Sequence, residues 1–299
     1  MKLGFGMMRL PRLENGSIDI EQAKTMVDLF MAAGGTYFDT AFVYEGSEEA
    51  TREALVKRYS REKFTLATKL NARVARSAED AKAQLLTSLE RTQAGYFDYY
   101  LLHALSGVGD NYKRYEEYGL WDFVREQKAA GRIKRIGFSF HGSPELLDKL
   151  LSAHPEVEFV QLQINYADWE NPGVASRRNW EICKAHGKPV VIMEPVKGGI
   201  LADPIPEVKA VFDRAGGGRS YASWALRFAA GLDNLLAVLS GMSNLAQMDD
   251  NLKTMKDFRP LDEGEMDLIR RAQAALDAGY ARNDVYRVKL RISEMFEEE

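Results

Sequence analysis

Four polar side chains end or follow short apolar segments in the first third of the chain. Asp39 lies within segment 36–41, Tyr44 follows five residues after Asp39, and Lys69 and His103 end later segments. A phenol has an ordinary pKa of about 10, and a neighbouring cation lowers this pKa because it stabilises the phenolate. If these side chains shared one pocket, Tyr44 beside Lys69 could exchange a proton with a substrate oxygen.

A repeating pattern of strands and helices would position these side chains. Several of the strands are apolar on both faces, as buried parallel strands are. Each strand precedes a helical stretch, and eight such units predict a (β/α)8 TIM barrel. A doubly wound sheet is the alternative, although a Gly-x-Gly-x-x-Gly turn between a strand and a helix is missing. The predicted strands are 2–6, 36–41, 64–70, 96–103, 133–140, 159–165, 189–194 and 235–240.

In a barrel of this kind the pocket lies at the carboxyl ends of the strands. The predicted strands therefore bring distant polar residues to one mouth. Taken singly, Asp39 could satisfy backbone amides, Lys69 could be solvated and His103 could be a packed histidine. Their joint placement with Tyr44 favours catalysis. The residues expected at the mouth are Asp39, Lys69, His103, Ser139, Gln161, Glu194 and Ser240.

Composition limits the classes of function. The 299 residues are 45% hydrophobic and 28% charged, which fits one globular domain over 1–299 with a helical and then charged tail from about 260. A formal net charge of -4 gives no reason to expect nucleic acid or an anionic membrane as a partner. A single cysteine, Cys183, excludes an intramolecular disulfide and argues against a cysteine-bound metal or iron–sulfur cluster.

The N-terminus lacks an apolar run of signal-peptide length, and no window approaches the length of a membrane span. We therefore expect a cytoplasmic protein. The oligomeric state cannot be read from the sequence.

The chain resembles the aldo-keto reductase family from Gly4 to Asn251. The motifs that carry the resemblance are Phe38-Asp-Thr-Ala41 with Tyr44, Ala67-Thr-Lys69, Asp98-Tyr-Tyr-Leu-Leu-His103, Gly137-Phe-Ser139 and Leu239-Ser-Gly-Met-Ser243. The resemblance implies a (β/α)8 barrel and nicotinamide-dependent reduction of an aldehyde or ketone, or the reverse oxidation. It implies that Tyr44 is the general acid, that Lys69 lowers its pKa, that Asp39 positions Lys69 and that His103 orients the carbonyl.

The resemblance also implies a set of cofactor contacts. Asp39, Gly6 and Met7 would lie on the nicotinamide side, and Ser139 and Gln161 would hold the carboxamide. The loop Pro195–Gly199, with Lys197, would close over the pyrophosphate. The adenosine side would use Gly241, Ser243, Gln247 and Asn251. No metal site is implied.

Three positions depart from the family pattern. Met193 stands where a tyrosine often stacks on the nicotinamide, and Phe140 replaces a frequent asparagine. Gly241 and Gln247 stand where a lysine and an arginine commonly bind the 2′-phosphate of NADP. A phosphate is held best by cations, so the cofactor could be NADP(H) or NAD(H). One branch of the family shares the Gly137-Phe-Ser-Phe-His-Gly142 and Met193-Glu-Pro195 wording and often carries a cysteine-rich extension. Without those cysteines, we expect no iron–sulfur cluster.

Two other functions remain open from the sequence. The first is a non-catalytic nicotinamide-binding redox sensor or regulatory subunit on the same barrel. The second is a metal-dependent hydrolase, which the sequence disfavours because no cluster of histidines and carboxylates ends the strands. The substrate is expected to be a small carbonyl compound, chosen by the loops 104–113 and 166–173 and the C-terminal segment.

Overall fold

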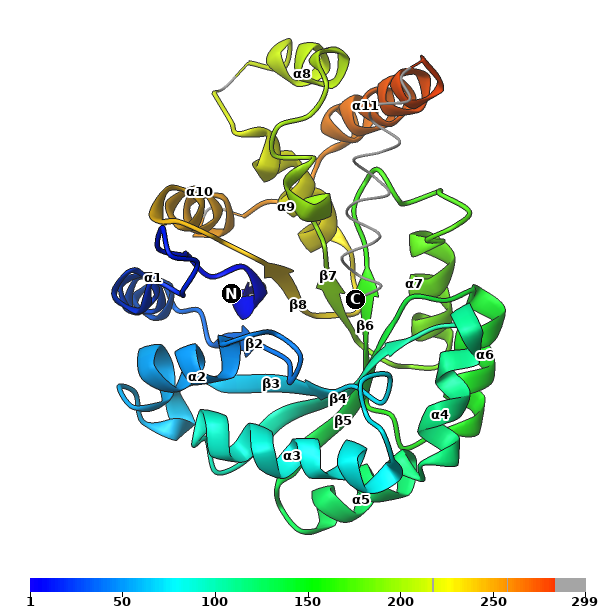
Figure 1. The fold of residues 1–299 in the computed structure, drawn as a ribbon. Coiled ribbons are helices and arrows are strands. Elements are labelled where there is room, and N and C mark those ends of the chain that lie inside the picture. Colours follow the sequence, from blue (N-terminus) through cyan, green and yellow to red (C-terminus); the bar gives the residue numbers. More distant parts are fainter. Residues whose placement is uncertain (217, 257, 283–299) are drawn as a thin grey trace.

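The computed structural model describes residues 1–216, 218–256 and 258–282. Within these residues, eight parallel strands pair in chain order and close into a barrel with helices around it (Figure 1). The predicted (β/α)8 barrel is confirmed, and the doubly wound sheet is excluded. The strands are β1 Leu3–Gly6, β2 Tyr37–Asp39, β3 Thr65–Leu70, β4 Phe97–Leu105, β5 Ile133–Phe140, β6 Phe159–Gln163, β7 Val190–Met193 and β8 Leu235–Ser240.

The helices form the outer layer (Figure 1). Two helices begin at side-chain caps: Asp19 accepts a hydrogen bond from the Gln22 amide, and Ser77 accepts one from the Asp80 amide. The α-helices are α1 Ile20–Ala32, α2 Ser47–Thr51, α3 Ala78–Thr92, α4 Asn111–Glu117, α5 Leu120–Ala129, α6 Pro144–Ala153, α7 Ser176–Ala185, α8 Pro206–Asp213, α9 Tyr221–Gly231, α10 Leu245–Lys256 and α11 Glu263–Arg282.

Three details of the helical layer depart from a simple alternation of strand and helix. The helical stretch after β4 is two helices, because Gly119 has a φ of 60° and breaks the run between α4 and α5. The helix after β2 continues beyond α2 as a π-helical turn, Arg52–Val56. Helix α8 is an additional helix between β7 and α9. It begins at Pro206 and lies beside α11 at the edge of the molecule (Figure 1). The charged tail beyond residue 282 lies outside the described residues.

Inside the barrel, apolar side chains form a small core. Successive residues of a strand point to opposite faces, so alternate residues fill this interior. Gly137 leaves room for a large neighbour, since a Cβ there would lie 2.5 Å from the Phe159 ring. The buried members of the cluster are Tyr37, Ala67, Leu101, Phe159, Val191, Ala237 and Leu239.

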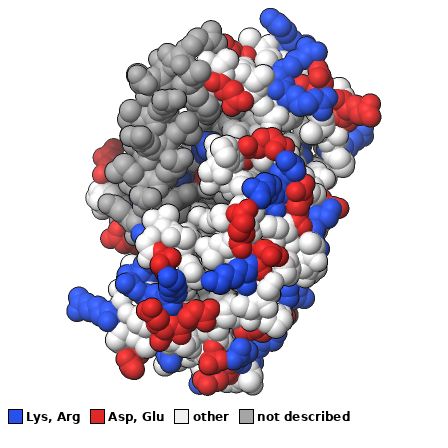
Figure 2. All heavy atoms as spheres, turned by 90° about the vertical axis from the view of Figure 1, so that its right-hand side faces the viewer, with Lys and Arg blue, Asp and Glu red and all other residues white. Residues whose placement is uncertain are grey.

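The other face of each strand packs against the helices in a much larger apolar cluster. This outer core explains why strands such as β3 and β4 are apolar on both faces. On the surface that Figure 2 shows, Lys and Arg lie interspersed with Asp and Glu and do not gather into a patch of one sign. In the part of the chain that the structure describes, none of the helices combines the length and the apolar character that a membrane span needs.

Candidate active site

The site is formed by residues that lie two positions further along each strand than the interior core residues, and that therefore point to the same side of the strand. Tyr37 is followed by Asp39, Ala67 by Lys69 and Leu101 by His103, with the first of each pair in the interior core. The neighbouring strands repeat this arrangement with Ser139, Gln161 and Met193. The predicted strand-end residues therefore lie at one mouth of the barrel and line a common cavity of about 400 Å³.

Lys69 and Asp39 form a buried ion pair at the bottom of this cavity. The Lys69 Nζ donates to Asp39 Oδ1 at 2.5 Å and to the Thr40 carbonyl at 2.7 Å. Both side chains are at least 95% buried. Burial raises the pKa of Asp39 against the opposing effect of Lys69. Burial alone would lower the pKa of Lys69, but Asp39 and Tyr44 outweigh it and raise this pKa. Lys69 is thus held as a cation under the phenol.

Tyr44 lies above this pair. The Lys69 ammonium is 4.9 Å from the centre of the Tyr44 ring, and the His103 ring lies edge-on to the Tyr44 ring at 5.7 Å. The sequence predicted that Lys69 lowers the pKa of Tyr44, and Lys69 does act in this direction, although the net shift of the pKa is upward. Burial raises the pKa of Tyr44 more than Lys69 lowers it. The phenol is therefore protonated at neutral pH and is suited to donate a proton.

A local irregularity in β4 places His103. The pairing register of β4 with β5 shifts between Leu102 and Leu105, and Ala104 has a φ of 55°. The Ala104 amide donates to Ser139 Oγ at 2.7 Å, which ties the irregularity to β5. Bulges of this kind often re-aim a side chain beside an active site. Sequence periodicity placed His103 at a strand end but could not reveal this tie.

Both histidines of the cavity are neutral at physiological pH. Burial lowers the pKa of His103 well below its usual value, and the nearby Lys69, His141 and Arg73 lower it further. Burial, with Arg73, lowers the pKa of His141 to about 4. A neutral imidazole can donate from one ring nitrogen and accept at the other, so His103 can hydrogen-bond a carbonyl oxygen without giving it a proton.

Most of the predicted cofactor residues line this cavity. The Oε1 atom of buried Gln161 has no hydrogen-bond partner among the described residues. Ser139 Oγ accepts from Ala104, which leaves its own hydroxyl hydrogen for another acceptor. The predicted residues among the lining are Gly6, Asp39, Ser139, Gln161, Met193, Pro195, Gly199, Gly241, Ser243, Gln247 and Asn251.

Two predicted cofactor residues are placed elsewhere. Lys197 is 5% exposed, and its ammonium contacts Asp168 Oδ1 at 2.6 Å instead of facing the cavity. The Met7 side chain is buried, and its carbonyl accepts a hydrogen bond from Ser47 Oγ at 2.9 Å. Their neighbours Gly198 and Met8 line the cavity instead. The Lys197 pair anchors the loop after β7 to the loop after β6.

Sequence reasoning missed Arg9 at the other end of the cavity. Arg9 follows β1 and lines the cavity, with Nη2 3.6 Å from Glu194 Oε1. A Cβ on Gly241 would lie 3.4 Å from the Arg9 Cδ, so the Arg9 side chain passes directly over Gly241. The signal available in the sequence was the position of Arg9, three residues beyond Gly6. The contact of Arg9 with Gly241 could not be predicted, because the two residues lie at opposite ends of the chain.

Two tryptophans and a histidine lie away from the site. Trp121 and Trp169 pack in the outer layer against Phe138 and Phe228. His154 is 8% exposed and stacks on Trp121 with ring centres 3.8 Å apart. These residues are part of the packing between helices and barrel.

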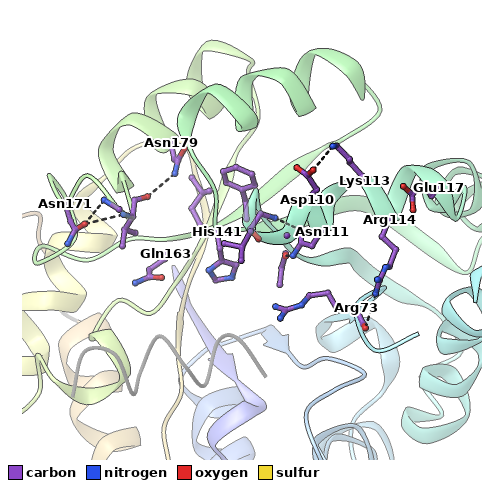
Figure 3. A pocket seen from close by; sticks show the side chains of 18 residues that line it. Arg73, Asp110, Asn111, Lys113, Arg114, Glu117, His141, Gln163, Asn171 and Asn179 are labelled. Atoms are coloured by element: carbon purple, nitrogen blue, oxygen red, sulfur yellow. Dashed lines mark hydrogen bonds and ion pairs between the residues drawn. The ribbon is translucent and has the colours of Figure 1, made fainter. Parts of the chain in front are cut away.

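A second cavity, of about 960 Å³, adjoins the first (Figure 3). Arg73, Ala104 and His141 line both, so the two cavities meet at these residues. Among the residues that the structure describes, no group of three or more histidines, cysteines or carboxylates is placed to hold a metal ion.

The family is shown by comparison with known proteins. The profile of the Aldo/keto reductase family matches residues 2–274. The chain therefore belongs to the aldo/keto reductase family, as the motifs around the cavity indicated.

Individual relatives are distant. A probable aldo-keto reductase 1 from Glycine max is 27% identical over 184 residues, which cover 56% of this chain and 48% of the relative. The aldo-keto reductase str7 from Strobilurus tenacellus is 28% identical over 220 residues, covering 67% and 59%. The chain thus spans about half the length of the curated relatives it matches.

Solved structures show the same fold. The holo form of aldo-keto reductase AKR11C1 from Bacillus halodurans superposes with a TM-score of 0.73 at 24% identity, over 91% of each chain. An aldo/keto reductase from Klebsiella pneumoniae, solved with NADP and acetate, gives a TM-score of 0.70 at 20% identity, over 90% of each chain.

Proposed function

We propose that this protein is a nicotinamide-dependent oxidoreductase that reduces an aldehyde or ketone to an alcohol, or catalyses the reverse reaction. The observation that carries this proposal is the arrangement of Tyr44 above the buried Lys69–Asp39 pair, with neutral His103 beside it. This set offers a proton donor and a hydrogen-bond donor to one substrate oxygen.

The protonation states support the reduction direction. A bound nicotinamide dinucleotide would supply the hydride to the carbonyl carbon. As negative charge grows on the carbonyl oxygen, the protonated Tyr44 hydroxyl gives it a proton, and the alcohol leaves. Lys69 stabilises the resulting phenolate, and water returns a proton to Tyr44. His103 stays neutral throughout and orients the oxygen.

The cavity suits the nicotinamide end of a dinucleotide. The unsatisfied Gln161 Oε1 is an acceptor and the Ser139 hydroxyl is a donor, which together match the amide NH2 and carbonyl of a carboxamide. Met193, exposed to the cavity, can pack on the nicotinamide ring in place of a tyrosine.

The other end of the cavity favours NADP(H). Gly241 leaves space that the Arg9 side chain fills, so a cation reaches the adenosine end from the loop after β1. Arg9 is 44% exposed, and its contact with Glu194 at 3.6 Å is too long for a strong hydrogen bond. Its guanidinium can therefore bind the 2′-phosphate. In this role Arg9 replaces the cations missing at Gly241 and Gln247.

The test of the proposed reaction is Tyr44→Phe. This change removes one hydroxyl, so we expect turnover of an aldehyde panel with NADPH to fall about 10²–10⁴-fold, with NADPH binding kept within about 2-fold by fluorescence titration. Tyr221→Phe is the control, because its hydroxyl contacts Asp213 at the exposed surface. Unchanged turnover in Tyr44→Phe would overturn the proposal. Tight NADPH binding without turnover in the unaltered protein would favour the redox sensor.

A further inference from the structure

The imidazole of His103 is not fixed through its buried nitrogen. The His103 side chain lines the catalytic cavity, and its Nδ1 atom is buried without a hydrogen-bond partner among the described residues. The ring meets Tyr44 edge-on at 5.7 Å, which is a packing contact. In many sites the second ring nitrogen of a histidine is fixed by a hydrogen bond. Here the direction of the ring depends on packing and on the backbone that carries it.

Hydrogen bonds from helix α4 hold this backbone. Asn111 and Tyr115 lie four residues apart and so share a face of α4. The Tyr115 hydroxyl donates to the His103 carbonyl. Asn111 Nδ2 donates to the Ala104 carbonyl at 2.8 Å, and Asn111 Oδ1 accepts from the Ser106 amide at 2.7 Å (Figure 3). One face of α4 therefore holds the irregular end of β4.

Tyr115 also reaches the segment after the neighbouring strand. Its hydroxyl accepts a hydrogen bond from the Ala72 amide at 3.2 Å, and Ala72 lies three residues beyond Lys69. The Tyr115 side chain is fully buried, and burial raises the pKa of its phenol. The phenol therefore stays protonated, and its hydrogen remains available to the His103 carbonyl. One buried hydroxyl thus connects the chain after Lys69 to the chain at His103.

We propose that Tyr115 is a positioning residue for the reduction, because its hydroxyl fixes the backbone of His103 and thereby the direction of the imidazole toward the substrate oxygen. Asn111 supports this role by holding the next residues of β4. Tyr115 is separate from the lining of both cavities in the part of the chain that the structure describes, so it acts through His103. This inference rests on the proposed function, since it adds a residue to the same site.

The first experiment is Tyr115→Phe, which removes the hydroxyl and keeps the ring. A displacement of about 1 Å can lower a rate about 100-fold. We expect a smaller displacement after the loss of one backbone contact, and a fall in kcat of about 10-fold. KM for the aldehyde should change less than about 3-fold, because a hydrogen bond to the carbonyl oxygen counts most as charge grows there. NADPH binding should stay within about 2-fold.

Tyr112→Phe is the matched control on the same helix. The Tyr112 ring lies 5.4 Å from the Lys149 ammonium, and phenylalanine keeps this ring, so kcat should be unchanged. Asn111→Ala removes the other contacts from α4 to β4 and should lower kcat about 3-fold. This variant tests the same inference if Tyr115→Phe does not fold. Circular dichroism at the assay temperature shows which variants are folded.

Two further measurements distinguish positioning from a general loss of structure. In His103→Ala, kcat should already be low, and adding Tyr115→Phe should lower it less than about 2-fold further, because the residue that Tyr115 acts through is gone. The ring signals of His103 in an NMR spectrum can be assigned by their loss in His103→Ala. They should shift in Tyr115→Phe and stay in place in Tyr112→Phe, and this measurement needs no substrate.

The outcomes separate this inference from the proposed reaction. If the unaltered protein reduces no aldehyde of the panel, the proposed function fails. The NMR signals of His103 then still decide whether Tyr115 fixes the imidazole, and unchanged signals overturn this. If the protein is active and Tyr115→Phe keeps its kcat, the positioning role is overturned. A 10-fold loss that persists in the His103→Ala background also overturns it, because Tyr115 would then act on the fold and not through His103.

Discussion

The Lys69–Asp39 ion pair affects both the stability of the fold and the chemistry of the site. Each would be costly to bury alone, and each offsets the other at a separation of 2.5 Å. Asp39 Oδ2 has no partner among the described residues, and the Lys69 ammonium also faces the Tyr44 ring. In the proposed reaction, the Asp39 carboxylate would keep Lys69 charged beside Tyr44 without being consumed.

Replacing Lys69 alone should lower both stability and turnover, whereas replacing Lys69 and Asp39 together should lower turnover but leave most of the stability. Lys69→Met leaves the Asp39 carboxylate buried without its partner, and we expect a loss of about 3–5 kcal/mol in the free energy of unfolding. Adding Asp39→Asn removes the buried charge and should restore most of this stability, whereas turnover should stay lost because Tyr44 has no cation beside it. Urea unfolding and steady-state kinetics measure the two effects. Equal stability of Lys69→Met and the unaltered protein would contradict the coupling.

At the scale of whole elements, a second ion cluster joins helix α9 to helix α11. Arg227 of α9 donates to both carboxylate oxygens of Glu265 on α11, at 2.7 and 2.5 Å, and Arg219 adds a contact at 2.6 Å. The Arg227 and Glu265 side chains are 8% and 18% exposed. Hydrogen bonds from Arg227 are the main cause that lowers the pKa of Glu265 to about 2. The first turn of α11 is thereby fixed to α9.

This lowered pKa predicts a pH-dependent contribution to stability. A carboxylate whose pKa falls on folding stabilises the folded state above its ordinary pKa, and this contribution is lost as pH falls through the folded value. Glu265→Gln should therefore lower the free energy of unfolding by about 3 kcal/mol at pH 7. The difference should shrink as pH falls from about 4.5 toward 2. Urea unfolding at pH 7 and pH 3 measures it.

Glu263 provides the control, because it lies exposed in the same first turn of α11. Glu263→Gln tests the general effect of negative charge at a helix start, which is about 0.3–1 kcal/mol. A loss of the same size in both variants, or a Glu265 effect that persists unchanged at pH 3, would contradict the role of the ion cluster.

At the scale of the whole molecule, the sequence predicts best what depends on the period of a strand. Residues 39, 69 and 103 follow interior residues by two positions, so the apolar pattern alone assigns them to the mouth once the barrel is inferred. Contacts between distant loops carry no such period. The pairing of Lys197 with Asp168, and the passage of Arg9 over Gly241, depend on how the loops after different strands fold across the barrel.

The direction of a pKa shift and the end of a helix were also hard to predict from residue types. The presence of Lys69 near Tyr44 suggests a lowered phenol pKa, but the sign of the shift depends on the degree of burial, which exceeds the effect of the cation. Similarly, the apolar period continues across 118–119, and only the positive φ of Gly119 separates α4 from α5. Both outcomes result from three-dimensional packing.

The proposed cofactor cavity is lined by residues that follow both the first and the last strand of the barrel, so the proposed cofactor preference can be tested through the stability of the whole barrel. Arg9 after β1 and Gln247 at the start of α10 line the same end of the cavity, so a bound dinucleotide would tie the first strand to the last. A ligand present at 100 times its Kd stabilises the folded state by about 2.7 kcal/mol, which corresponds to a rise in Tm of about 5 °C for a chain of this size.

We expect NADPH to raise Tm by about this amount and NADH, at the same concentration, to raise it less, because only NADPH carries the 2′-phosphate that Arg9 can bind. Arg9→Gln should reduce the NADPH shift to that of NADH and leave the NADH shift unchanged. Arg12→Gln is the control, since Arg12 lies in the same N-terminal segment and contacts the Gly16 carbonyl at the surface. Equal shifts with both cofactors in the unaltered protein would contradict the NADP preference. An equal loss of both shifts in Arg9→Gln would instead place Arg9 at the pyrophosphate, which the two cofactors share.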